Sequence, residues 1–312
     1  IAAVPDEFLV NEDVVKGSMT LVDADRSAHL YSRISNPTQT SGGSASNTAY
    51  GLASLGGRAG FIGKIADDEL GRVFGADMDK VGVGFHPGAT SATEPTGRCI
   101  IAVTPDGQRS MSTFLGAASL LEPADISREA VQSGAVLFLE GYLFDRDEAK
   151  AAFKMASKYA HEAGRKVALT LSDSFCVDRH REDFLDLILN DIDVLFCNEF
   201  ELQSLYQTSY EEALEQLRSD CEFGAVTRDK RGSVVINGHD LVHIEPEPVD
   251  WVIDATGAGD QYAAGFLYGF TRGMAIEHCG RLGSMSASEV ITHVGPRPLV
   301  QLSTLIPEHL RS

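Results

Sequence analysis

From about residue 120 onward, short apolar runs alternate with stretches that have the pattern of amphipathic helices. The runs at 135–139, 167–171 and 194–197 are almost continuously apolar. Between them, residues 146–163 and 181–189 place apolar and alanine positions at helical spacing. Continuous apolar strands separated by such helices are typical of a parallel sheet that is covered on both faces. The pattern therefore predicts an α/β fold with a central, mostly parallel sheet flanked by helices.

Two segments break this alternation. Residues 18–22 and 97–115 have the pattern of short β-strands, and the second contains a Pro-Asp-Gly turn at 105–107. Short strands joined by such turns form small antiparallel units. We predict a small β-sheet beside the central one. An edge hairpin without a moving part is the plainer interpretation.

Length and composition limit the classes of protein to consider. With 312 residues the chain is long enough for one large α/β domain with a small appendage. Its net charge of −19 opposes binding to nucleic acid or to an anionic membrane surface. The five cysteines are scattered and form no Cys-x-x-Cys pair, which fits a reducing, cytoplasmic environment. We see no membrane-length apolar run and no signal peptide.

A Gly-Ala-Gly-Asp string at 257–260 precedes a helical stretch of small residues. Such a turn exposes backbone N–H groups at the positive end of a helix dipole, where an anion binds. Asp260 lies in the first turn, beside that anion. If the anion is a phosphoryl group in transfer, this carboxylate can take the proton of an attacking hydroxyl. Taken alone, the string is also an ordinary strand-to-helix turn, so its interpretation depends on other segments.

Several candidate residues have the same position relative to the predicted strands. Phe175, Asn198, Thr227 and Asp260 each come just after a predicted strand. In parallel α/β sheets, ligands bind beyond the carboxyl ends of the strands. We therefore expect these residues to gather at one edge of the sheet.

Further motifs occur in a defined order. Gly42, Gly43 and Asn47 lie in the first third, Asn-Glu-Phe-Glu occupies 198–201, and Thr227 is followed by Gly232. With the final Asp-Ala-Thr-Gly-Ala-Gly-Asp at 254–260, the chain resembles the ribokinase-like (PfkB) family of small-molecule kinases over nearly its whole length. Within that family it is most similar to the adenosine kinases, in Pro-Thr-Gly-Arg-Cys at 95–99, Arg-Ser-Met at 109–111 and Leu-Ser-Asp-Ser-Phe at 171–175.

The resemblance implies a ribokinase-like fold with a small β-sheet lid over the substrate. Lid segments at approximately 9–36 and 95–118 would be inserted on a core of residues 37–94 and 119–312, all within a single domain. The family pattern begins with a strand ending in Gly-Asn-x-x-x-Asp, and the sequence starts at Ile1, which we place just past that strand. We therefore expect the strand and its substrate-binding Asp to precede Ile1.

The resemblance also implies roles for individual residues. Asp260 would be the general base on the ribose 5′-hydroxyl of a nucleoside. The amides of Gly257, Ala258 and Gly259 would meet the γ-phosphoryl group of ATP. Gly42, Gly43 and Asn47 would hold sugar hydroxyls, and Asp260 would contact the same sugar. The apolar pocket for adenine would comprise Met19, Leu21, Cys99, Met111, Thr113, Phe175 and Leu205, with Phe175 against the face of the base.

The resemblance assigns the nucleotide side in the same way. Asn198 and Glu201 would organise Mg²⁺, largely through water. Some family members also bind K⁺ beside the segment that matches Asp254 and Thr256, so K⁺ is an optional further cofactor. ATP would be held by Asn198, Thr227, Gly232, Thr256, Gly257 and Gly259, with Arg109 reaching the phosphates from the lid.

The sequence departs from the family pattern at two further places. Ala255 replaces a frequent Thr, and Asp229 replaces the first Gly of the usual Thr-x-Gly-x-x-Gly segment. The main hypothesis is an ATP-dependent nucleoside 5′-kinase acting on adenosine, as a monomer or a lid-mediated homodimer. A ribokinase- or fructokinase-type sugar kinase is the first alternative. A catalytically idle nucleoside-binding regulator is the second.

Overall fold

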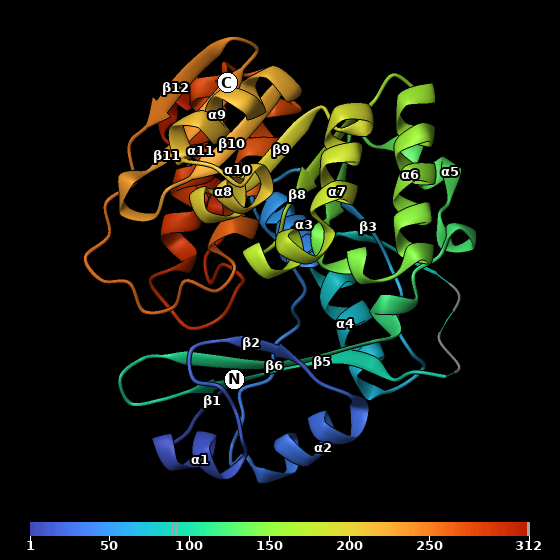
Figure 1. The fold of residues 1–312 in the computed structure, drawn as a ribbon, viewed down its shortest axis with the longest axis vertical. Coiled ribbons are helices and arrows are strands. Elements are labelled where there is room, and N and C mark those ends of the chain that lie inside the picture. The colour runs from blue at the N-terminus through green and yellow to red at the C-terminus, as the bar shows by residue number, and fades with distance from the viewer. Residues whose placement is uncertain (89, 91–92, 311–312) are drawn as a thin grey trace.

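The computed structural model describes residues 1–88, 90 and 93–310. Its largest sheet has six strands: four neighbouring strands are mutually parallel, and a hairpin of two further strands extends one edge through antiparallel pairing (Figure 1). This confirms the predicted central, mostly parallel sheet. The strands are, in spatial order, β12 (Asp240–Ile244), β11 (Ser233–Asn237), β10 (Phe223–Thr227), β9 (Val194–Asn198), β8 (Lys166–Thr170) and β7 (Val136–Glu140).

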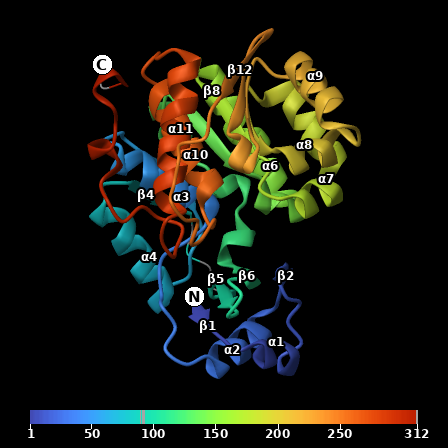
Figure 2. The ribbon, with the colours of Figure 1, turned by 90° about the vertical axis from the view of Figure 1, so that its left-hand side faces the viewer.

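Helices cover both faces of this sheet (Figure 2). One face carries α6 (Asp147–Glu162), α7 (Ser174–Asp191), α8 (Glu199–Tyr206) and α9 (Tyr210–Asp220). The other carries α10 (Ala258–Phe270) and α11 (Ile276–Val290), and α3 (Ser44–Ser54) packs against α10. Along the described part of the chain, each helix is too short or too polar to cross a lipid bilayer.

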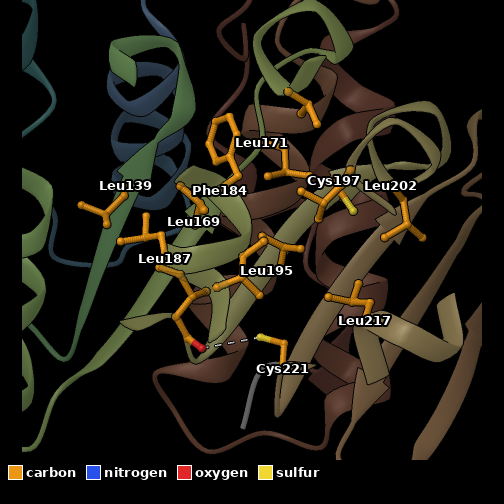
Figure 3. Packing of buried hydrophobic residues seen from close by; sticks show 14 of the residues in the cluster. Leu139, Leu169, Leu171, Phe184, Leu187, Leu195, Cys197, Leu202, Leu217 and Cys221 are labelled. Atoms are coloured by element: carbon orange, nitrogen blue, oxygen red, sulfur yellow. Dashed lines mark hydrogen bonds between the residues drawn. The ribbon is translucent and has the colours of Figure 1, made fainter. Parts of the chain in front are cut away.

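The strands are apolar throughout because both faces are buried. Leu169 and Leu195 pack toward the first set of helices, in a cluster that includes Phe184 and Leu202 (Figure 3). Their neighbour Val194 belongs to a second cluster with side chains of α10. Burial on both faces removes the alternation of polar and apolar residues, which is the physical basis of the predicted parallel sheet.

A second, four-stranded sheet lies below the main sheet in Figure 1, with the helices α1 (Asp6–Asn11) and α2 (Ala24–Arg33) beneath it. We call it the small sheet. The segments 18–22 and 97–115 enter it as predicted, and residues before position 9 join it too. Its strands are, in spatial order, β1 (Ala2–Ala3), β5 (Thr96–Val103), β6 (Arg109–Gly116) and β2 (Met19–Leu21).

The remaining described elements are a further pair of strands, two helices and several short turns. β3 (Gly60–Gly63) and β4 (Gly84–Pro87) form a parallel pair that packs with α4 (Glu69–Lys80), and α5 (Arg128–Ser133) precedes β7. Short 3₁₀ turns occupy Ala117–Leu120, Pro123–Asp125, Gly141–Asp145, Asp229–Arg231, Leu302–Thr304 and Glu308–Leu310.

One helix begins much earlier than its pattern predicts. The helix expected at 181–189 is part of α7, which starts at Ser174 because the Asp173 side chain accepts a hydrogen bond from the Cys176 amide at 2.7 Å. The helix departs from helical geometry at His180 (φ −126°, ψ 27°). Its mixed polar first turns hide the apolar periodicity, and the early start places Phe175 in the first helical turn.

Candidate active site

A cavity of about 2200 Å³ is lined by residues at the carboxyl ends of the main-sheet strands and by residues of the small sheet, and it extends along α3, β3 and β7. Small-molecule sites usually measure about 300–1,000 Å³, so this one has room for two small ligands together. Asn198 and Thr227 lie at the ends of strands at this edge, as predicted, whereas Asp260 follows the strand-free segment 245–257, which corrects the expectation for that residue. The cavity walls bring together motifs that are far apart in the sequence. They include Gly42, Gly43, Asn47, Asn198, Glu201, Thr227, Thr256, Gly257, Ala258, Gly259 and Asp260.

The turn before α10 has a backbone that glycine must provide. Gly257 has φ +80°, and a Cβ atom there would lie 2.5 Å from the Pro296 carbonyl oxygen. At Gly259 a Cβ would meet no heavy atom within 4 Å. The Ala258 amide donates to the Ala255 carbonyl at 3.2 Å. This differs from the expectation that all three amides of the turn point toward a phosphoryl group, because the turn itself uses the Ala258 amide.

Asp260 lies where the N-termini of α3 and α10 meet. Ser44 Oγ donates to its Oδ1 at 2.7 Å, and Asn47 Nδ2 donates to its Oδ2 at 2.9 Å. Burial of the carboxyl raises the pKa of Asp260, although these two hydrogen bonds act in the opposite direction. A carboxylate whose pKa is raised toward neutrality, and which still borders the cavity, is suited to accept a proton.

Glu140, which sequence reasoning missed, ends β7 on the same cavity wall. Its carboxylate accepts a hydrogen bond from the Ala45 amide in the first turn of α3 at 2.6 Å. Burial, together with the negative charge of Asp260, raises its pKa to about 7, although the hydrogen bond from the Ala45 amide acts in the opposite direction. The sequence could have predicted this position. Glu140 directly follows an apolar run, as Asn198 and Thr227 do, and the same rule places it at the carboxyl end of a strand.

Asn198 and Glu201 form a reciprocal cap at the start of α8. Asn198 Nδ2 donates to Glu201 Oε1 at 2.6 Å, and the Asn198 amide donates to Glu201 Oε2 at 2.9 Å. Burial raises the pKa of Glu201 to about 7. A cation in the adjoining cavity would stabilise the ionised form of this carboxylate. Within the described residues, no three His, Cys, Asp or Glu side chains are grouped closely enough to ligate a metal directly.

In the loop after β10, an aspartate occupies a position whose backbone conformation favours glycine. Asp229 lines the cavity with φ +53°, in the left-handed region. Gly232 has φ +74°, and a Cβ there would lie 2.0 Å from the Ile244 carbonyl oxygen. Gly232 is not among the described residues that line the cavity, so its contribution is to the turn that positions Thr227 and Asp229.

Arg109 joins the small sheet to the turn before α10. Its guanidinium donates to Thr256 Oγ1 at 2.5 Å and forms an ion pair with Asp254. The Asp254 carboxylate also accepts hydrogen bonds from the Thr256 amide at 2.8 Å and the Gly295 amide at 2.9 Å. Arg109 therefore reaches across from the small sheet to the turn before α10.

The small sheet supplies most of the predicted apolar pocket. Register pairs Met19 with Met111 and Leu21 with Thr113, which in turn pairs with Cys99. All five side chains line the cavity, as expected.

Two expected pocket residues lie elsewhere. Leu205 is fully buried in the main core, because it lies on the inward face of α8, and this corrects the prediction. Phe175 is 63% exposed and is not among the described cavity-lining residues. Phe200, which sequence reasoning did not single out, lines the cavity and is 66% exposed.

Comparison with known proteins agrees with this architecture. The model of the pfkB family carbohydrate kinases matches residues 13–302. The crystal structure of adenosine kinase from Sinorhizobium meliloti is 46% identical, with a TM-score of 0.92 over 97% of this chain and 94% of that one. A probable sugar kinase from Rhizobium etli CFN 42 is 43% identical, with a TM-score of 0.92 over 97% of this chain and 93% of that one.

A curated relative extends the range of substrates within the family. The 5-dehydro-2-deoxygluconokinase of Bacillus subtilis is 28% identical over 296 residues, which cover 86% of this chain and 87% of the relative. Relatives of this chain thus include kinases named for a nucleoside and for a sugar acid. The family model spans both the small sheet and the main sheet, and the chain therefore belongs to the pfkB family of carbohydrate kinases and is a phosphotransferase.

Proposed function

We propose that the protein transfers the γ-phosphoryl group of ATP to the 5′-hydroxyl of a nucleoside, with adenosine as the preferred acceptor. The observation that carries this proposal is the position of Asp260, held by two donors from α3 at the N-terminus of α10 and bordering the cavity. A carboxylate beside a helix N-terminus places a group that accepts a proton next to a site that binds an anion such as a phosphoryl group.

The apolar wall favours a nucleoside over a bare sugar. Met19, Leu21 and Met111 of the small sheet line the cavity, and such side chains bury the faces of a flat heterocycle. The 46% identity with the adenosine kinase of Sinorhizobium meliloti supports the same acceptor. Phe200, in the first turn of α8, lines the cavity and offers an aromatic surface for a base.

The proposed reaction is an in-line displacement. Asp260 accepts the proton of the 5′-hydroxyl while that oxygen bonds to the γ-phosphorus and the bond from phosphorus to the ADP oxygen breaks. The N-terminus of α10 stabilises the charge on the transferring group. Arg109 is placed to contact the phosphates once it leaves Asp254. Thr227 and Thr256, at the ends of β10 and of the turn before α10, contribute hydroxyls on the nucleotide side.

The buried carboxylate of Glu201 fits a cation in this part of the cavity, because ionisation there is costly without one. Asn198 and Glu201 would hold Mg²⁺ through its water shell, and the ion supplies charge neutralisation of the phosphates when bound. K⁺ beside Asp254 and Thr256 stays a prediction, to be tested by comparing the rate in potassium and tetramethylammonium chloride.

A sugar kinase is the alternative, and the match to 5-dehydro-2-deoxygluconokinase favours it. Coupled measurement of ADP release across adenosine, other nucleosides, ribose and fructose separates the two. We expect adenosine to give far the highest kcat/KM. A clear preference for a free sugar would move the assignment to the alternative.

The decisive variant is Asp260→Asn, which keeps the shape and removes the base. We expect kcat and kcat/KM to fall by roughly 10²–10⁴, the usual contribution of a positioned base, while ATP binding persists. Asp147→Asn is a matched control, since Asp147 also opens a helix but its side chain is 98% exposed. If the wild type turns over and Asp260→Asn keeps most of that rate, the mechanism is wrong. An idle binding protein would show no turnover before or after the change.

A further inference from the structure

Arg297 is a charged side chain buried behind the proposed catalytic carboxylate. It follows α11 in the C-terminal loop and is 8% exposed. Its Nε donates to Asn47 Oδ1 at 3.3 Å, its Nη2 donates to Ser46 Oγ at 3.2 Å, and its guanidinium lies 4.8 Å from the centre of the Tyr50 ring. All three partners belong to α3. Burying a guanidinium is costly, so its placement against one helix calls for a specific explanation.

The contact with Asn47 continues to Asp260. An Asn side chain has one accepting and one donating end, whereas a guanidinium only donates and a carboxylate only accepts. Because Arg297 faces one end of the Asn47 amide, that end must be Oδ1. The donating Nδ2 is then directed to Asp260, 2.9 Å away. Arg297 thus fixes which end of this amide meets the carboxylate.

The loop that carries Arg297 is itself tied to the site. The Gly295 amide donates to Asp254 Oδ2 at 2.9 Å. Gln261, the residue after the proposed base, donates through Nε2 to the Pro296 carbonyl at 3.1 Å and to the Asn47 carbonyl at 3.0 Å. These bonds join the loop, α10 and α3 at one point, so the guanidinium is held at a fixed position relative to Asp260.

We propose that Arg297 is a positioning residue for phosphoryl transfer: it holds the Asn47 amide in the one orientation that donates to Asp260. The proposal rests on the function proposed above. Without Arg297 the Asn47 amide is held from the Asp260 end alone, so its hydrogen bond to Asp260 becomes less well positioned, the ionised form of Asp260 is less favoured, and the carboxylate is held less firmly toward the acceptor hydroxyl. ATP contacts lie on other residues, so nucleotide binding is not the step affected.

The test compares Arg297→Met with Arg297→Lys, using whichever acceptor the wild type phosphorylates best. We expect Arg297→Met to lower kcat at least tenfold, to leave KM for ATP within twofold, and to move the acid limb of the kcat–pH profile upward. Arg297→Lys should recover part of kcat, because an ammonium still donates but lacks the planar fork. Arg128→Met is the matched control and should keep wild-type kcat, since Arg128 also stacks on a tyrosine, Tyr159, but on the surface.

A double-mutant cycle separates positioning from general support of the fold. Arg297→Met and Asn47→Ala should show kcat losses that do not multiply, because both break the same chain of hydrogen bonds. Multiplying losses, or a folded Arg297→Met with kcat within twofold of wild type, would overturn the proposal. If Arg297→Met does not fold, Arg297→Lys decides: an unchanged kcat and pH profile would equally overturn it.

Failure of the proposed function gives a different result. The wild type would then phosphorylate no nucleoside, whichever way Arg297 acts. The same double-mutant cycle is also measured by urea unfolding, which needs no substrate and shows whether Arg297 and Asn47 contribute to stability independently. Non-additive changes in unfolding midpoint support the contact chain, and additive changes contradict it.

Discussion

The replacement Glu140→Gln changes charge in the site without changing size. The amide cannot ionise, and its oxygen can still accept the hydrogen bond from the Ala45 amide. In the folded protein, burial raises the pKa of Glu140 from its ordinary 4.5 to about 7. The folded state therefore binds a proton more tightly than the unfolded chain does between these two pH values.

This difference in proton binding between the folded and unfolded states decides at which pH Glu140 stabilises the fold. The contribution of Glu140 to stability is fully present below pH 4.5 and is lost as pH rises through about 7. The difference between the two pKa values, at about 1.4 kcal/mol for each pH unit, corresponds to roughly 3 kcal/mol. Because the side chain keeps some access to water, we expect Glu140→Gln to stabilise the fold by about 1–3 kcal/mol at pH 8. The gain should vanish near pH 4.5.

Urea unfolding followed by far-UV circular dichroism at pH 5, 6, 7 and 8 measures this difference. Glu148→Gln is the control, because Glu148 opens α6 with its side chain 56% exposed and should show little pH-dependent gain. The reasoning is refuted if Glu140→Gln gives the same change in unfolding free energy at every pH, or if it destabilises the protein at pH 8. Either result would mean that Glu140 is ionised at low cost in the folded state.

Two further predictions concern the acceptor side of the cavity. Phe200→Ala should raise KM for the nucleoside by the equivalent of about 1–3 kcal/mol while KM for ATP changes little, since Phe200 lines the cavity and loss of a stacking surface weakens base binding; an unchanged nucleoside KM would leave Phe200 without a role in binding. Hydrogen exchange by mass spectrometry should show increased protection of residues 18–36 and 97–118 when adenosine is added, because a phosphoryl-transfer site must exclude water. Equal protection with and without adenosine would count against a closing lid.

The fold could be predicted from the sequence in those segments where burial produces a recognisable pattern of apolar residues. Strands buried on both faces are apolar throughout, and parallel strands bring the residues at their carboxyl ends to one edge of the sheet. The positions of Asn198 and Thr227 could therefore be predicted together, whereas Asp260 follows a loop after β12 and not a strand, so the strand rule did not place it. The same rule covers Glu140, which was missed because no motif drew attention to it. Phe200, inside the Asn-Glu-Phe-Glu string, was hidden by its polar neighbours.

The remaining features depend on contacts that local patterns do not encode. Leu205 was placed in the pocket because its segment matched, but the face of α8 that points to the core is decided by packing against the sheet. The early start of α7 depends on the side chain of Asp173. Arg297 stood out in no motif, since its partner Asn47 is 250 positions away in the sequence.

That separation has a consequence for how the protein is made. At 5–20 residues per second, roughly 12–50 s pass on the ribosome between the synthesis of Asn47 and that of Arg297. For most of this interval α3 lacks α10 (Ala258–Phe270), and until its end it lacks the C-terminal loop that carries Arg297. The central strands can pair before the catalytic centre exists. The proposed site is therefore completed late in synthesis, and a nascent chain stalled before position 297 lacks the hydrogen bond from Arg297 to Asn47.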